Sequence, residues 1–383
     1  MIKPVLILTV LMGALAGCGS DDDGGIQFTR TGATANENGG TPKQFSDNAF
    51  LAEQYSLVTG DGRACSYGVL NAFSSGYLKC WGRRIIGDYV SENVTGASKM
   101  LSIGRDHVCT TLSDFGGRRV GCAGDNEFGQ TIDPEVATSE SNRKGHWLEN
   151  PYILASGSNH NCAVDAFGVY CWGDNASGQT SVPSLTNPKW VAAGGNTSCA
   201  IDGDDALHCW GDNQAGQLNI PETLGAVSHV AVGSDFVCAI SNGQVTCWGN
   251  TQGQAWQTPS TFSDAVYITA GERHACVLDQ VQARSDTQSG LVASCFGEDN
   301  NDENLLAVPS TMQDNIRTIS AGKGFTCAKN VYEGEDYLGS TTHYGIHCWG
   351  ANDENQAVSP NIMCANFHKT AEAIEDRFCP VVN

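Results

Sequence analysis

The chain has 383 residues, and its 21 Lys and Arg against 42 Asp and Glu give a formal net charge of −21 at pH 7. A charge of this sign argues against nucleic acid as a partner, and against anionic lipid headgroups unless divalent cations bridge them. Sixteen of the 17 cysteines fall between residues 65 and 379, a content typical of proteins that fold in an oxidising compartment.

The N-terminal segment 1–17 has the pattern of a secretory signal. Lys3 precedes an apolar run over residues 5–16, which is too short for a transmembrane helix. The run ends in Leu-Ala-Gly-Cys at 15–18, which resembles the lipobox of bacterial lipoproteins. An ordinary cleaved signal peptide is the alternative interpretation.

The lipobox resemblance implies that Cys18 is diacylated and becomes the first residue of the mature chain. Gly19, rather than Asp, follows it, which in Gram-negative bacteria implies an outer-membrane lipoprotein, facing either the periplasm or the cell surface. Residues 18–49 carry few apolar side chains and many Gly, Asp, Asn and Thr, so we predict a flexible, lipid-anchored tether. No later segment is a transmembrane candidate, and the only expected attachment to the membrane is the lipid.

A unit with two cysteines recurs seven times between residues 50 and 360. Each copy opens with Gly-x-x-x-x-Cys and closes with Cys-Trp-Gly or a variant, as in GSDFVCAISNGQVTCWGNTQGQ at 233–254. The second cysteines of successive units are 38 to 53 residues apart. This period, with several short strands in each unit, indicates a β-propeller. We therefore predict an all-β, seven-bladed propeller with about four strands in each blade.

Within each unit the two cysteines are expected to cross-link a hairpin. Asn242-Gly243 is a strong signal for a two-residue turn, and centring the turn there sets Cys238 opposite Cys247 in a non-hydrogen-bonded pair. The Cα atoms of such a pair lie about 4.5 Å apart, a spacing that a disulfide accepts. Structural zinc is the competing interpretation, but the sequence contains no Cys-x-x-Cys. The predicted disulfides are Cys65–Cys80, Cys109–Cys122, Cys162–Cys171, Cys199–Cys209, Cys238–Cys247, Cys276–Cys295, Cys327–Cys348 and, in the tail, Cys364–Cys379.

The Trp after the second cysteine is expected to fill the space between neighbouring blades, because side chains alternate along a strand. A segment ending in Pro, such as LNIP at 218–221, supplies the fourth strand in this scheme. The first unit lacks that segment and a spare copy, AVSP, follows the last unit at 357–360. We therefore expect a C-terminal strand to complete the N-terminal blade and close the ring. Residues 361–383 are predicted to form a disulfide-closed appendage.

Over about residues 50–360 the units, with the pattern AGxxHxCA…VYCWGDNxxGQ, resemble the repeats of the regulator of chromosome condensation family. The resemblance implies a seven-bladed propeller, in the disulfide-stapled form of exported bacterial proteins. It says little about function, since propellers support many activities. The eukaryotic namesake is a nucleotide-exchange factor for a nuclear GTPase that also binds chromatin. An exported, acidic lipoprotein meets neither partner, so we do not expect nucleotide exchange here.

Three units carry a histidine at the fourth position of their Gly-x-x-His start: His107, His160 and His274. We interpret these side chains as bonded to a nearby backbone turn, because no Gly-x-Ser-x-Gly, His-Glu-x-x-His or P-loop motif accompanies them. The Asp-Asn of GDNxxGQ is interpreted as a device that caps its own loop. Acidic clusters at 298–304 and 352–355 lack the regular spacing of a calcium loop. We predict no catalytic residues, no cofactor and no metal site, and leave Ca²⁺ binding by the acidic loops open.

The spacing of the cysteines is uneven and suggests where a partner binds. It is 9, 10 and 9 residues in units three to five, but 19, 21, 15 and 13 in units six, seven, one and two, which are contiguous in a closed ring. Loops on a rigid scaffold commonly bind partners, and Tyr and Arg are favoured at interfaces. The alternative is a set of surface insertions whose aromatic side chains fold back locally. The predicted partner-binding residues are Tyr67, Phe73, Tyr77, Phe115, Arg118, Arg119, Arg284, Tyr332, Tyr337, His343 and Tyr344.

The sequence thus favours a non-catalytic cell-envelope lipoprotein whose long loops bind or scaffold a protein or glycan partner in the envelope or extracellular space. An inhibitor of an exported enzyme is the first alternative, since the short units are similar in length to those of secreted β-lactamase-inhibitor propellers. An enzyme acting on envelope polysaccharide or peptide is the second.

Overall fold

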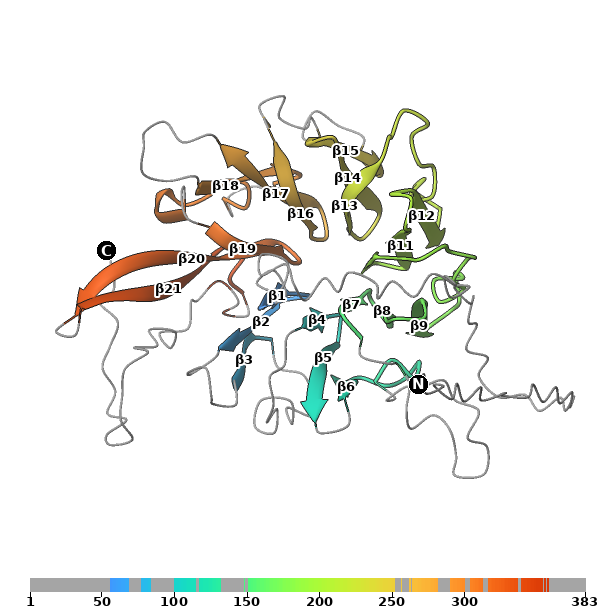
Figure 1. The fold of residues 1–383 in the computed structure, drawn as a ribbon, viewed down its shortest axis with the longest axis horizontal. Helices are drawn as coiled ribbons and strands as arrows, with labels where there is room; N and C mark the ends of the chain where they lie inside the picture. The colour runs from blue at the N-terminus through green and yellow to red at the C-terminus, as the bar shows by residue number, and fades with distance from the viewer. Residues whose placement is uncertain are drawn as a thin grey trace, which may run out of the picture.

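The computed structural model describes residues 56–68, 77–83, 100–114, 117–131, 151–251, 264–281, 290–299, 304–312, 316–336 and 339–353, with residues 148, 256, 262, 355 and 357. The predicted signal segment, Cys18, the tether and the pair Cys364–Cys379 lie outside the described residues. The described residues form seven separate three-stranded sheets arranged around a centre, as in a propeller (Figure 1).

Each blade is an antiparallel sheet of three strands that are consecutive in the chain. The blades are: blade 1, β1 (Leu57–Thr59), β2 (Arg63–Gly68) and β3 (Tyr77–Gly82); blade 2, β4 (Leu101–Ile103), β5 (His107–Asp114) and β6 (Gly117–Gly124); blade 3, β7 (Ile153–Ser156), β8 (His160–Val164) and β9 (Val169–Gly173); blade 4, β10 (Trp190–Gly194), β11 (Thr197–Ile201) and β12 (Leu207–Gly211); blade 5, β13 (Val227–Val232), β14 (Phe236–Ser241) and β15 (Gln244–Gly249); blade 6, β16 (Ala265–Ala270), β17 (His274–Val281) and β18 (Gly290–Gly297); blade 7, β19 (Ile316–Ala321), β20 (Phe325–Asp336) and β21 (Gly339–Gly350). The 3₁₀ helix η3 (Ser310–Met312) precedes blade 7.

The second and third strands of each blade form the predicted cross-linked hairpin. Asn242 and Gly243 have φ angles of 52° and 71°, the two positive values that a type I′ turn needs. This turn sets Cys238 opposite Cys247, with their Cα atoms 4.1 Å apart. The other six blades carry the same cross-link, at Cys65–Cys80, Cys109–Cys122, Cys162–Cys171, Cys199–Cys209, Cys276–Cys295 and Cys327–Cys348.

The predicted fourth strand is wrong: in the part of the chain that the structure describes, every sheet has three strands. The segments expected to supply it, at 180–183, 218–221 and 306–309, are irregular or turns. Their backbone donors are used locally. In the first of them the N–H of Val182 donates to Thr180 O at 3.1 Å, and Pro183 has no N–H to offer a neighbouring strand.

The ring closes where the innermost strands of blades 7 and 1 meet. The N–H of Thr59 donates to Ser320 Oγ at 3.0 Å, and the N–H of Lys323 donates to Gly60 O at 3.1 Å. Among the described residues no C-terminal strand joins blade 1, and residues 358–360 of the predicted closing strand lie outside them.

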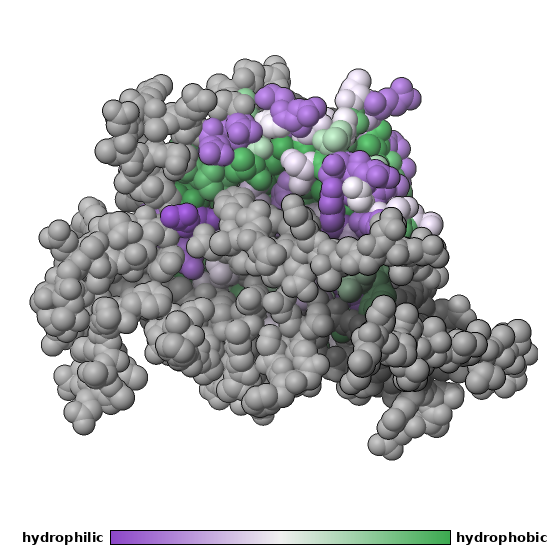
Figure 2. Space-filling model, in the orientation of Figure 1, coloured by the Kyte–Doolittle hydropathy of each residue, from purple (hydrophilic) through white to green (hydrophobic). Residues whose placement is uncertain are grey.

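The apolar core lies between neighbouring blades, as predicted for the tryptophans. Trp172, Trp210, Trp248 and Trp349 are buried. Each indole N–H donates to a backbone carbonyl in the loop that follows the preceding blade, for example Trp248 Nε1 to Gln217 O at 2.7 Å. In blade 6 Phe296 takes this position and packs with Trp256 and Phe262. Figure 2 shows hydrophilic residues over the outside of the described part, with apolar residues between them.

Candidate functional site

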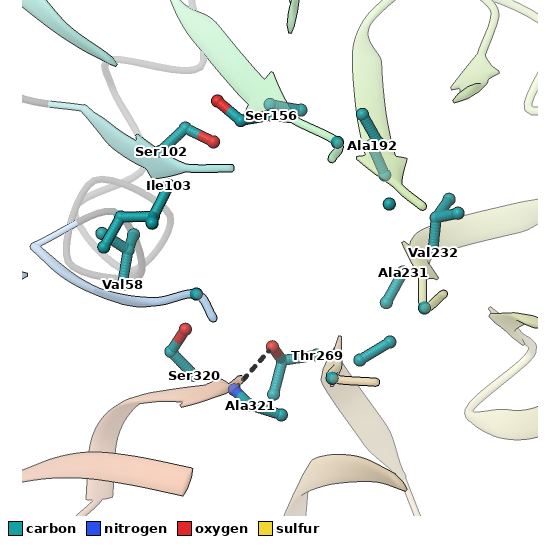
Figure 3. Close-up of a pocket in the computed structure, with 18 of the residues that line it drawn as sticks. Val58, Ser102, Ile103, Ser156, Ala192, Ala231, Val232, Thr269, Ser320 and Ala321 are labelled. Carbon is teal, nitrogen blue, oxygen red and sulfur yellow. Dashed lines mark hydrogen bonds between the residues drawn. The ribbon is translucent and has the colours of Figure 1, made fainter. Parts of the chain in front are cut away.

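The innermost strands of all seven blades surround a central channel with a cavity of about 410 Å³. This volume falls near the lower end of the roughly 300–1,000 Å³ common for small-molecule sites. Small side chains from every blade point into the channel (Figure 3). The lining residues labelled there are Val58, Ser102, Ile103, Ser156, Ala192, Ala231, Val232, Thr269, Ser320 and Ala321.

Two of the channel hydroxyls join adjacent blades. Thr269 Oγ1 accepts a hydrogen bond from the N–H of Ala321 at 3.1 Å (Figure 3), and Ser320 Oγ accepts from the N–H of Thr59. An innermost strand has no neighbouring strand on its channel side, so these hydroxyls satisfy backbone donors that would otherwise lack a protein partner. We assign them to holding the ring together.

One mouth of the channel carries a row of ion pairs. The Asp61 carboxylate lies 3.6 Å from Arg83, 4.0 Å from Arg105 and 3.5 Å from Lys323, whose side chains come from blades 1, 2 and 7. Lys323 also lies 3.9 Å from Glu272 of blade 6. The row therefore crosses the junction at which the two ends of the propeller meet. Partly exposed pairs of this kind contribute about 0–1 kcal/mol each.

The three candidate histidines are fully buried and bridge adjacent blades. His107 Nε2 lies 2.8 Å from Asn161 Oδ1, His160 Nε2 lies 2.8 Å from Ser198 Oγ, and His274 Nε2 lies 2.7 Å from Thr326 Oγ1. The prediction of a backbone-turn partner is therefore wrong: each partner is a side chain of the next blade. Burial lowers the pKa of His160 to about 3 and that of His274 to about 4.

A glycine three residues before each histidine makes room for the ring. A Cβ built at Gly157 would lie 2.2 Å from His160 Cε1, and one at Gly104 would lie 2.1 Å from His107 Cε1. Such contacts are too short for any side chain. The Gly-x-x-His pattern is thus a packing requirement between blades, and the buried, neutral rings are not accessible to a substrate.

The GDNxxGQ loops are held by their own side chains, as predicted for the Asp-Asn pair. Asn175 Oδ1 accepts from the N–H of Thr180 at 3.0 Å, and Gln179 Nε2 donates to Asp174 Oδ2 at 3.0 Å. Blades 2 and 4 repeat both bonds. The sequence reasoning missed the glutamine. Its backbone carbonyl accepts the indole N–H of the next blade, and its recurrence in three units was the available signal.

The hairpins of blades 7, 6 and 2, three of the four with widely spaced cysteines, have the longest strand pairing beyond the disulfide among the described residues. Beyond the disulfide, strand pairing continues for nine residue pairs in blade 7 and for five in each of blades 6 and 2. Blade 1 has three such pairs, and its connecting residues 69–76 lie outside the described part. Blades 3, 4 and 5 have two, two and three. In Figure 1 the β20–β21 hairpin extends away from the ring as a long ribbon.

Seven of the predicted partner-binding residues lie on strands of these hairpins, and the structure places their backbones there. In blade 7, for example, Tyr332 pairs with His343. Phe73, Phe115, Arg284 and Tyr337 lie outside the described residues. The seven on strands are Tyr67, Tyr77, Arg118, Arg119, Tyr332, His343 and Tyr344. Their role in binding stays a prediction.

Within the described ranges, no three His, Cys, Asp or Glu side chains are grouped so that they could hold a metal ion. No helix in the same ranges is long and apolar enough to cross a membrane.

Comparison with known families matches residues 191–217 to the Regulator of chromosome condensation (RCC1) repeat. These residues run from β10 to the end of the GDNQAGQ loop of blade 4, and the same unit builds all seven sheets. The chain is a seven-bladed propeller with a matched RCC1 repeat in blade 4. A search of curated proteins finds no match.

Solved structures show the same fold at low identity. This propeller is 22% identical to the ectodomain of the receptor kinase CR4 from Physcomitrella patens, over 77% of this chain and 72% of that one, with a TM-score of 0.53. The CRINKLY WD40 ectodomain of the Arabidopsis thaliana receptor kinase ACR4 gives 21% identity, coverages of 79% and 97%, and a TM-score of 0.52. Human WBSCR16 gives 18% identity, coverages of 70% of this chain and 84% of that one, and a TM-score of 0.50. Identities this low establish the fold alone.

Proposed function

We propose that this RCC1-type propeller is a non-catalytic scaffold that binds a protein partner through the hairpin rim of blades 6, 7, 1 and 2. The observation that carries the proposal is the unequal length of the hairpins. Blade 7 continues for nine residue pairs beyond its disulfide, whereas blades 3 and 4 continue for two. Since all seven blades share one core design, the added length serves something other than the core.

A rigid support favours this use of the rim. A disulfide fixes each described hairpin at its base, and indole and imidazole groups bridge the blades. Extensions on such a scaffold are positioned in advance, so less conformational entropy is lost on binding. The three buried histidines and the channel hydroxyls of Thr269 and Ser320 bond to neighbouring blades, which supports a structural role for them.

The proposal includes anchoring to a bacterial outer membrane through Cys18 and the tether 18–49, on the strength of the Leu-Ala-Gly-Cys sequence. Growth with a radiolabelled fatty acid tests this part separately. The label is expected on the wild-type protein and not on Cys18→Ser, and equal labelling of both would reject lipid attachment at this cysteine.

Affinity capture from an envelope extract tests the binding surface. We expect the combined variant Tyr77→Ala, Tyr332→Ala, Tyr337→Ala to lose the partner while keeping the wild-type melting temperature. A matched control is Phe167→Ala, which removes an aromatic side chain that is 38% exposed in the short hairpin of blade 3; it should capture the partner normally. Undiminished capture by the triple variant would reject the rim. If the captured protein is an enzyme whose turnover stops on binding, the scaffold acts as an inhibitor.

A further inference from the structure

The outer strand of blade 7 has a long edge with no strand partner among the described residues. β21 pairs only with β20, and β19 pairs with β20 only as far as Asn330. From Val331 to Asp336 the hairpin is therefore a two-stranded ribbon. Two strands without a third are marginally stable by themselves, and an added strand stabilises them.

The register shows which backbone groups face this edge. Cys327 and Cys348 form a non-hydrogen-bonded pair, since they carry the disulfide and their Cα atoms are 4.0 Å apart. Hydrogen-bonded and non-hydrogen-bonded pairs alternate along an antiparallel ladder. The N–H and C=O groups of Ser340, Thr342 and Tyr344 therefore point away from β20, toward the free edge.

Natural proteins protect long edges with charged residues, proline, bulges or very short strands. β21 has neither charged residues nor proline: its twelve residues, GSTTHYGIHCWG, contain no Lys, Arg, Asp, Glu or Pro. The outer strands of blades 1 and 2 do carry cations, Lys79 in β3 and Arg118 and Arg119 in β6. The outer strands of blades 3 and 4 have five residues each. The outer strands of blades 5 and 6 also lack charged residues and proline, but they have six and eight residues, so β21 is the longest unprotected outer strand that the structure describes.

We propose that the free edge of β21 accepts an extended, basic segment of the partner as an added β-strand. Backbone pairing of this kind is an established mode of peptide recognition. The expected charge follows from the acidic end of β20, Glu333, Glu335 and Asp336, and from the net charge of −21. A second copy of the chain would bring the same acidic end and the same net charge, which opposes pairing between copies. This inference rests on the proposed function, because it specifies how the rim holds its partner.

The test uses the full chain and a blocked ten-residue peptide that alternates Val and Lys, with binding measured by fluorescence anisotropy. The double variant Ser340→Pro, Thr342→Pro removes two outward N–H groups and leaves the bonds between β20 and β21 in place. Its matched control, Ser340→Ala, Thr342→Ala, keeps both groups. We expect the Pro variant to bind at least about tenfold more weakly than the wild type and the Ala variant about equally, with melting temperatures alike.

Equal binding by the Pro and Ala variants would overturn edge pairing. A peptide with Glu in place of Lys that binds as tightly as the Lys peptide would overturn the basic occupant. Concentration-dependent dimerisation in sedimentation, present in the wild type and lost in the Pro variant, would show that a second copy occupies the edge. Capture of the envelope partner by the Pro variant, with loss in the tyrosine variant, would reject this inference and leave the proposed function intact.

Discussion

Acidification to pH 5 should loosen the contacts between blades while the disulfides stay intact. The sensitive groups are His160, His229 and His274, which are buried between or beneath adjacent blades. His229 packs between the rings of Trp190 and Tyr267, with centroids 4.2 and 4.6 Å away. Burial lowers the pKa of His160 and His229 to about 3 and that of His274 to about 4.

The sign and size follow from proton linkage. A histidine whose pKa is about 6.5 in the unfolded chain and near 3 or 4 when folded contributes stability above pH 6.5, and loses it as the pH falls below that value. At pH 5 each of the three favours the unfolded state by about 2 kcal/mol, or about 6 kcal/mol together. Domains are commonly stable by only about 5–15 kcal/mol, so the loss should be readily measured.

Burial also lowers the pKa of His107, but the hydrogen bond to Asn161 and the neighbouring carboxylates Asp106 and Asp125 act in the opposite direction. We therefore leave His107 out of the sum. Asp202, whose pKa is lowered by hydrogen bonds from His208, Ala206 and Asp204 against the effect of burial, titrates below the chosen interval. Burial also lowers the pKa of His347, so His107 and His347 add to the loss of stability between pH 8 and pH 5 with the same sign as the three histidines.

The assay is urea unfolding of the disulfide-intact protein at pH 8, 6.5 and 5, monitored by tryptophan fluorescence. His274→Gln provides the control, because glutamine retains a hydrogen-bonding amide and does not titrate. Whatever its stability at pH 8, its free energy of unfolding should fall by about 2 kcal/mol less than that of the wild type over the interval. A wild-type free energy that is constant from pH 8 to 5, or an equal fall in the variant, would refute the reasoning.

Three further changes test the contacts between blades. Asp61→Asn removes the carboxylate shared by Arg83, Arg105 and Lys323, so we expect the free energy of unfolding to fall by about 1–2 kcal/mol, and by less in 1 M salt. The control Glu222→Gln, at an exposed residue, should have little effect. A loss that does not depend on salt would contradict the ion-pair role. Gly157→Ala places a methyl group 2.2 Å from His160 Cε1 and should lower the free energy of unfolding, measured by thermal unfolding, by about 1–3 kcal/mol. Combining it with His160→Ala should recover part of this loss. If the double variant recovers nothing, another contact is responsible. Trp248→Phe removes the donor to Gln217 O and should lower the free energy of unfolding by about 1–3 kcal/mol. Peptide mapping should find the same disulfides as in the wild type. An unchanged free energy of unfolding would argue against a role for the hydrogen bond.

The repeat predicts the seven blades and the tryptophans between them, and the finer details that the sequence predicts correctly are local ones. The turn at Asn242-Gly243 determines the pairing of Cys238 with Cys247 through geometry contained within ten residues. The capping of each GDNxxGQ loop by Asn and Asp is equally local. Both follow from the conformational preferences of a few residues, so one sequence is enough to derive them.

The features that were missed depend on neighbours that are remote in the chain. His107 bonds to Asn161, which is 54 residues later, and no local pattern shows that these two side chains meet. The absent fourth strand has a related cause. Its segments contain β-branched residues such as Val182, Ile220 and Val308, but short-range hydrogen bonds take up backbone donors there, and propensity alone does not decide between the two.

The blade 7 hairpin combines both cases and links the fold to the proposed function. A spacing of 21 residues between Cys327 and Cys348 predicts a long excursion, but a flexible loop and a paired ribbon satisfy the same spacing. In the structure the excursion is paired along its whole length, from Phe325↔Gly350 to Asp336↔Gly339. A ribbon fixed at its base by a disulfide presents its backbone in one orientation, which a flexible loop does not. That difference makes pairing with an added strand, rather than side-chain contact alone, the more specific prediction for this rim.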